Sequence, residues 1–225
     1  MPLVIAIDGP AGAGKSTVAQ KVAARLGLNY VDSGATYRAT ALKVLQAGLA
    51  PDDEQAVARL IAPMDIRIIT DGLQPRVSID GQDVTDQIRT PEVTLASAQV
   101  SRLPEVRAKL MAVQRSCVAG RGVVMEGRDI GTVVFPDAPL KIFLKADAVE
   151  RARRRLKQDS KKGRSATLEQ TAGEITLRDQ LDAERKISPL LAAPDAHQID
   201  STNLVADQVV EEILDLARRN KLVEP

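Results

Sequence analysis

One segment near the N-terminus has residue types and a spacing suited to phosphate binding. It matches the pattern G-x-x-x-x-G-K-[ST] and consists of Gly9, Pro10, Ala11, Gly12, Ala13, Gly14, Lys15, Ser16 and Thr17. Its glycines let successive backbone N–H groups point into one concavity, and a following helix adds partial positive charge. We expect Lys15 to reach the β- and γ-phosphates of ATP or GTP, and the Ser16 hydroxyl to hold Mg²⁺. An apolar run before it and a helical pattern after it favour this interpretation over a plain turn.

A second candidate group, Glu126-Gly127-Arg128-Asp129, follows the apolar run 123–125. The planar guanidinium of Arg128 can bind two phosphoryl oxygens at once, which suits it to stabilise charge on them. An ordinary surface ion pair with Asp129 is the alternative interpretation. The position after a sheet strand favours the functional one, because parallel sheets bind ligands at the carboxyl ends of their strands.

A third group is a charged helical pattern. Arg178, Asp182 and Arg185 recur at i, i+4 and i+7, so we expect them to share one helix face. A solvated stripe of ion pairs uses the same spacing, and the residues alone favour neither interpretation.

A basic stretch precedes that pattern, with nine basic and three acidic residues between 145 and 164. A solvated helix or a nucleic-acid patch is one interpretation. A short basic loop between two helices also suits a lid that closes over a triphosphate and excludes water. Which of its arginines point inward stays open. The chain has few aromatic residues, and none lies in this stretch, which argues against a platform for single-stranded nucleic acid.

The elements that must position these residues follow from apolar periodicity. Apolar runs predict strands at 3–7, 30–31, 122–125, 140–144 and 198–200. Helical spacing predicts helices at 16–26, 36–47, 91–119 with a break near Pro104, 148–158, 168–187 and 204–219. Such alternation predicts an α/β fold, with a parallel sheet core and helices on both faces.

Between residues 64 and 84 the period changes to two. Isoleucine and valine alternate with polar residues there, and turn signals stand at Asp71-Gly72 and Asp80-Gly81. This part is predicted to be a small antiparallel insert.

Composition narrows the class of protein. The 225 residues suit one domain or two, and a net charge of +1 gives no overall attraction to nucleic acid. Cys117 is the only cysteine, which excludes an intramolecular disulfide and fits a reducing compartment. No apolar stretch approaches the roughly 18 residues of a membrane span, and the N-terminus does not resemble a signal peptide. We therefore expect a cytoplasmic protein. Cys117 and His197 have no partner cluster and are expected to be structural.

Three segments together resemble the cytidylate kinase family. They are the phosphate loop (residues 9–17), residues 31–38 and residues 126–136. The similarity extends through 86–89 and 104–107 to Pro189, so it covers nearly the whole chain. It implies a single kinase domain over 1–225, a P-loop NTPase-like fold with a monophosphate-binding insert at about 33–95 and a lid at about 150–170. It also implies a monomer.

The resemblance implies transfer of the ATP γ-phosphoryl group to CMP or dCMP, with Mg²⁺. Ser33 and Arg38 would contact the acceptor nucleotide, Arg38 at its phosphate, and Arg107 and Asp129 would read cytosine. A carboxylate accepts from the N4 amino group and a guanidinium donates to ring acceptors. The same resemblance implies that the sugar and phosphates are contacted by Arg178, Asp182 and Arg185. The catalytic cations would be Lys15, Arg128, Arg178 and Arg185.

One position departs from the family. A serine that helps to bind the base lies nine residues before the arginine matching Arg107, and this chain has Ala98 there with Ser97 beside it. Either Ser97 or a water replaces the contact, or the contact is missing. This departure leaves open a related kinase acting on UMP, AMP or shikimate, although residues 127–136 argue against it. The basic stretch leaves open an alternative of another class, an RNA-associated ATPase.

Overall fold

The computed structural model describes residues 2–70, 75–118, 121–161, 163 and 165–224. Its centre is a parallel sheet with the strand order β2-β6-β1-β7-β8. In that order the strands are β2 (Asn29–Asp32), β6 (Val123–Gly127), β1 (Val4–Asp8), β7 (Leu140–Lys145) and β8 (His197–Asp200). The end of β1 pairs with the end of β6, Asp8 opposite Gly127. The phosphate loop and the 126–129 segment therefore leave the sheet side by side.

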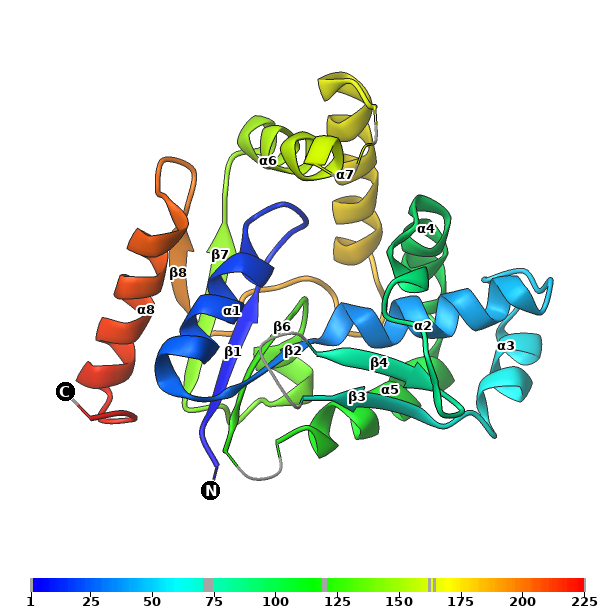
Figure 1. The fold of residues 1–225 in the computed structure, drawn as a ribbon, viewed down its shortest axis with the longest axis horizontal. Coiled ribbons are helices and arrows are strands. Elements are labelled where there is room, and N and C mark those ends of the chain that lie inside the picture. The colour runs from blue at the N-terminus through cyan, green and yellow to red at the C-terminus, as the bar shows by residue number, and fades with distance from the viewer. Residues whose placement is uncertain (1, 71–74, 119–120, 162, 164, 225) are drawn as a thin grey trace.

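Helices cover both faces of this sheet, as the sequence predicts. Ile5 and Ile7 of β1 pack with α1 (Lys15–Leu26) and α8 (Ala206–Arg219) on one face. Because side chains alternate along a strand, Val4 and Ala6 point to the other face. There they pack with the π-helical turn η2 (Ile130–Val134) and with Cys117, just past α5. The predicted α/β fold is confirmed (Figure 1).

A second apolar cluster lies beside the main sheet. It joins a small antiparallel sheet to four helices. The strands are β3 (Ile66–Ile69), β4 (Arg76–Ile79) and β5 (Gln82–Asp83), and the helices are α2 (Ser33–Gln46), α3 (Glu54–Ile61), α4 (Pro91–Val100) and α5 (Pro104–Ser116), with the 3₁₀ turn η1 (Gln87–Arg89) before α4. The predicted antiparallel insert is confirmed, and so is the helix break near Pro104. The turn signal at Asp71-Gly72 lies outside the described residues.

Two helices stand beyond the carboxyl ends of the strands, at the top of Figure 1: α6 (Ala148–Lys161) and α7 (Leu168–Ala183). The sequence analysis predicted that α7 extends to residue 187, and this end is wrong. The chain leaves the helix after Ala183, and the Leu190 N–H donates back to the Asp182 carbonyl over 3.0 Å. Ser188 takes a left-handed conformation with φ of 54° to make this turn. Among the described residues, no helix combines the length and apolarity needed to cross a membrane.

Candidate active site

The phosphate loop connects the end of β1 to the start of α1, as its motif predicts. Gly9 has φ of 148°, and a Cβ placed there would meet the Leu144 carbonyl oxygen at 2.0 Å, so only glycine fits. Because Gly9 has no side chain, the loop can lie directly against the end of β7. The Lys15 ammonium folds back over the loop and donates to the Pro10 carbonyl over 2.8 Å.

Lys15 is buried at a place where cations crowd together. Burial and then the nearby Arg128 lower the pKa of its ammonium, while Glu126 acts in the opposite direction, and together they bring it from 10.5 to about 7. The loop thus holds a cation whose charge is poorly compensated by the protein. An anion bound there would relieve this penalty.

Four residues predicted to act on the phosphates or sugar come together between β6 and α7: Arg128, Arg178, Asp182 and Arg185. The Arg128 Nε donates to Asp182 over 2.8 Å, and Arg185 pairs with the other oxygen of the same carboxylate. Burial pushes the pKa of Asp182 upward, but the neighbouring cations outweigh it and hold this pKa below 3.8. Because α7 ends at Ala183, Arg185 does not share a helix face with Arg178 as predicted; it reaches Asp182 from beyond the helix end.

Arg178 is the least compensated member of this group. Burial lowers its pKa to about 9, and Arg128 contributes to the shift. The Nε atoms of Arg178 and Arg185 are buried and have no hydrogen-bond partner among the described residues. Such unpaired donors are costly, and they point to a ligand with several acceptor oxygens.

Ser33 and Arg38 lie at the start of α2, which begins three residues earlier than the predicted 36. Ser33 is the first residue of the helix, and its hydroxyl donates to the Glu126 carbonyl over 2.7 Å. Arg38 pairs with Asp32 over 2.6 Å. A helix N-terminus beside an arginine is a favourable place for a phosphate.

Asp129 and Arg107 form a buried ion pair. The other donors of Arg107 bind the Ser101 carbonyl and the Ser188 hydroxyl, each over 3.2 Å, and its guanidinium lies 5.6 Å from the centre of the Tyr37 ring. Burial raises the pKa of Asp129, while Arg107 and Arg185 oppose the rise. Each of the three Arg107 nitrogens therefore has an acceptor.

Ala98, the position that departs from the family, is buried on α4. Ser97 and Ser101 flank it, and the hydroxyls of both donate to helix carbonyls, those of Thr94 over 2.7 Å and Ala98 over 2.9 Å. Their remaining lone pairs are acceptors. Ser101 was not considered in the sequence analysis.

One cavity gathers most of the predicted residues. Its lining includes Ala11, Gly12, Gly14, Lys15, Ser16, Thr17, Ser33, Arg38, Ser97, Ala98, Ser101, Arg128, Asp129, Arg178, Asp182 and Arg185. Of the predicted set, Gly9, Pro10, Ala13 and Arg107 do not line it; they support residues that do. The phosphate loop forms one end of the cavity, and Asp129 with the α4 serines forms the other.

The basic helix α6 lies against the phosphate loop. Arg151 donates to the Ala11 carbonyl over 3.0 Å and pairs with Asp179 of α7, which accepts from the Ala11 N–H over 3.1 Å. Of the basic stretch, Arg155 lines the cavity, together with Gln158. Lys162 and Arg164 lie outside the described residues.

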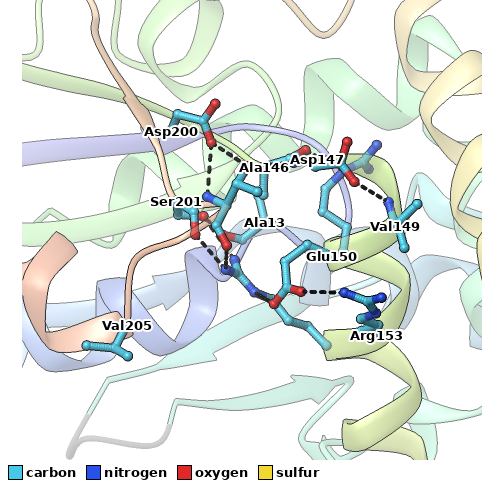
Figure 2. Close-up of polar contacts among 12 residues, drawn as sticks. Ala13, Ala146, Asp147, Val149, Glu150, Arg153, Asp200, Ser201 and Val205 are labelled. Carbon is cyan, nitrogen blue, oxygen red and sulfur yellow. Dashed lines mark hydrogen bonds and ion pairs between the residues drawn. The ribbon is translucent and has the colours of Figure 1, made fainter.

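Arg154, in contrast, turns away from the cavity. It donates to Glu150 and to both the hydroxyl and the carbonyl of Ser201. The Ser201 hydroxyl also contacts the Ala13 carbonyl over 3.2 Å. Figure 2 shows Ser201, Ala13 and Glu150 meeting where α6, the loop after β8 and the phosphate loop come together.

Comparison with known proteins agrees with this geometry. The family model described as cytidylate kinase matches residues 5–219. The chain belongs to the cytidylate kinase family. A cytidylate kinase of Azotobacter vinelandii is 48% identical over 95% of this chain and 94% of its own length. One of Caldanaerobacter subterraneus subsp. tengcongensis is 48% identical, covering 96% and 95%. A bifunctional pantoate ligase/cytidylate kinase of Synechocystis is 50% identical over 96% of this chain and 43% of its own length.

Within this cytidylate kinase site, sequence reasoning gave no role to two carboxylates, although it named Glu126 as part of a candidate group. Glu126 is buried and accepts from the Tyr30 hydroxyl over 2.7 Å; burial raises its pKa, and the Ser16 and Tyr30 hydroxyls oppose the rise. Asp8 accepts the N–H groups of Ile130 and Gly131 over 2.8 and 2.7 Å, and burial raises its pKa to about 6. The available signal was their place at the ends of adjacent buried strands.

Proposed function

We propose that this chain is an ATP-dependent nucleoside-monophosphate kinase that transfers the γ-phosphoryl group of ATP to CMP or dCMP, giving ADP and CDP or dCDP. The observation that carries the proposal is one cavity with a phosphate loop at one end and Asp129 at the other. Arg178, whose pKa is lowered by burial, lines the same cavity with Arg128 and Arg185. Family membership supports the same activity.

At the donor end, the loop N–H groups and Lys15 would bind the β- and γ-phosphates. Lys15 gains most when an anion arrives, because burial already penalises its charge. Arg128, Arg178 and Arg185 would stabilise charge on the transferring group while a CMP phosphate oxygen attacks in line. The acceptor phosphate is already anionic, so neither a strong general base nor a covalent enzyme intermediate is required.

At the acceptor end, Ser33 and Arg38 would hold the CMP phosphate, and Asp182 would orient the sugar with the arginines. Asp129, supported by Arg107, would accept from the N4 amino group of cytosine. Uracil presents an acceptor at that position, so it would meet repulsion and lose a hydrogen bond. A desolvated mismatch of this kind costs about 1–3 kcal/mol.

Mg²⁺ is part of the proposal. Ser16 and Glu126 both line the cavity, and the Ser16 hydroxyl lies close enough to the Glu126 carboxylate to act against the rise in its pKa. Hydroxyl, carboxylate and phosphate oxygens are the ligands that Mg²⁺ prefers. Ser16 would hold the ion with Glu126 beside it, and the bound ion would neutralise charge that develops on the phosphates.

We further propose a single kinase domain over residues 1–225, with a monophosphate-binding insert at about 33–95 and a lid at about 150–170. The contacts of Arg151 and Arg155 with the loop and cavity support the lid. A monomer in the cytoplasm that does not bind nucleic acid completes the proposal. The lone cysteine and the near-neutral net charge support these last points.

The test is a coupled ADP-release assay with MgATP and, separately, CMP, dCMP, UMP, AMP, GMP and shikimate. Fast turnover with CMP or dCMP and little with the others is expected. Comparable turnover with UMP would keep the kinase and overturn its base selectivity. ADP release that needs no acceptor and is stimulated by RNA would overturn the proposal in favour of an ATPase.

A further inference from the structure

Ser188 lies just beyond α7, far in sequence from the residues expected to read the base. It is buried at 9% exposure and adopts the left-handed conformation, which a residue other than glycine takes only at a cost. The Leu190 N–H holds this turn to the end of α7 through the Asp182 carbonyl. The turn therefore fixes where the Ser188 side chain points.

The Ser188 hydroxyl supports the base-end ion pair through its arginine. It accepts from the Arg107 Nε over 3.2 Å, and Arg107 pairs with Asp129 through another nitrogen. The hydroxyl also helps to lower the pKa of the Asp129 carboxylate, against the effect of burial. Arg107, Asp129 and Ser188 thus form a chain of buried polar contacts with Arg107 in the middle.

This chain of contacts limits how Asp129 can turn in the cavity. A carboxylate offers about four acceptor positions, and Arg107 takes one of them. Asp129 lines the cavity, so remaining lone pairs are available to a ligand. Without the hydroxyl, Arg107 would lose the acceptor of its Nε, and with it one of the contacts that fix its orientation toward Asp129.

We propose that Ser188 is a positioning residue for base recognition, whose hydroxyl holds Arg107 and Asp129 in the orientation that accepts the amino group of cytosine. This inference rests on the proposed function, since it assumes that CMP or dCMP is the acceptor. It places part of base selection on the segment that follows α7.

The test compares steady-state kinetics of wild type, Ser188→Ala and Ser188→Gly with CMP, UMP and ATP varied in turn. Alanine removes the hydroxyl and keeps the unfavourable backbone conformation; glycine removes both the hydroxyl and that strain. Ser116→Ala on the exposed side of α5 is the matched control. Both Ser188 variants should raise the KM for CMP about tenfold, the effect of one hydrogen bond to a charged group. The KM for ATP should stay within about twofold, and the preference for CMP over UMP should fall about tenfold.

Either of two results would overturn the inference. One is an unchanged KM for CMP in both variants. The other is wild-type kinetics in Ser188→Gly with a loss only in Ser188→Ala, which would reduce Ser188 to a backbone role. If alanine prevents folding, the glycine variant decides by the same criteria. A wild type that phosphorylates neither CMP nor dCMP would instead overturn the proposed function, and this inference with it.

Discussion

The phosphate end and the base end of the cavity are both built on buried charged side chains, but they differ in how these charges are paired. At the phosphate end, Lys15 and Arg178 have lowered pKa values because burial and neighbouring cations disfavour their charged forms. At the base end, Arg107 has an acceptor for each of its three nitrogens. One end is completed only by a ligand, whereas the other is complete beforehand.

The difference follows from what each end must recognise. Phosphates carry several charges and change charge distribution during transfer, so unpaired cations are held ready for them. Cytosine differs from uracil in the direction of a few hydrogen bonds, so the base end needs fixed donors and acceptors. Removing charge should therefore have opposite effects on the stability of the two ends.

The largest effect is expected from Lys15→Met. Loss of the cation at the transferring phosphoryl group should lower kcat about 1000-fold, or about 4 kcal/mol. Without nucleotide, the melting temperature should rise, because a poorly compensated buried charge is gone. Calorimetry and the ADP assay check both parts, with exposed Lys21→Met as the control. A clearly lower melting temperature would contradict the comparison.

Arg107→Met should have the opposite effect on stability. It leaves the Asp129 carboxylate buried without its main partner, which should reduce the free energy of unfolding by about 3 kcal/mol. Urea titration measures this change, and Arg102→Met, at an exposed position on the same side of the fold, is the control. Equal stability of the Arg107 and Arg102 variants would mean that the base end is not prearranged.

The pH dependence of stability sharpens the comparison. The pKa of Lys15 is about 7 in the folded protein and 10.5 when unperturbed, so the unfolded chain binds more protons between these values. Stability without nucleotide should rise with pH across this window, by about 2 kcal/mol between pH 7 and pH 9. Denaturation of wild type and Lys15→Met at both pH values isolates the contribution. An identical pH slope in the two proteins would contradict it.

Asp129→Asn tests the chemistry of the base end. An amide can turn either its oxygen or its NH₂ group toward the base, so it no longer rejects the uracil acceptor. The preference for CMP over UMP, measured as kcat/KM, should fall about tenfold, or 1.4 kcal/mol. Asp137→Asn at an exposed position should leave this ratio unchanged. An unchanged ratio in the Asp129 variant would remove Asp129 from base recognition.

The smallest effect is expected from Ala98→Ser, which restores the family residue. Ser97 and Ser101 already line the cavity on either side of this position, with lone pairs free to accept. The KM for CMP should therefore change less than about threefold, below the value of one good hydrogen bond. A tenfold decrease would show that the alanine leaves a real gap in base binding.

The sequence predicted the sheet, most helices and the phosphate loop because these depend on local patterns. Three short elements were not predicted, the 3₁₀ turn η1 among them. The helix α3 has only eight residues and is marked chiefly by its cap, where Asp53 accepts from the Ala56 N–H over 3.0 Å. The π-helical turn η2 follows from the two N–H bonds to Asp8, a partner more than a hundred residues away.

The residues of the candidate site also fall into two groups, those that the sequence predicted and those that only the structure identifies. Motif and family resemblance named most of the side chains that now line one cavity. They did not identify Ser188 or Asp179, whose contacts depend on where α7 ends and how it packs. Periodicity predicted that α7 extends to 187, because charged residues continue the helical spacing past Ala183. Only the bond from Leu190 back to Asp182 shows why it ends.

The Asp8 carboxylate has a consequence for how the site can vary. It belongs to the central strand that carries the phosphate loop, and it holds the backbone just after Asp129. The separation between the donor and acceptor ends is therefore set by the least exposed part of the sheet. Movements of α6 and α7 can change when the two nucleotides react. The distance between the two nucleotide sites, in contrast, is set by the central β-sheet.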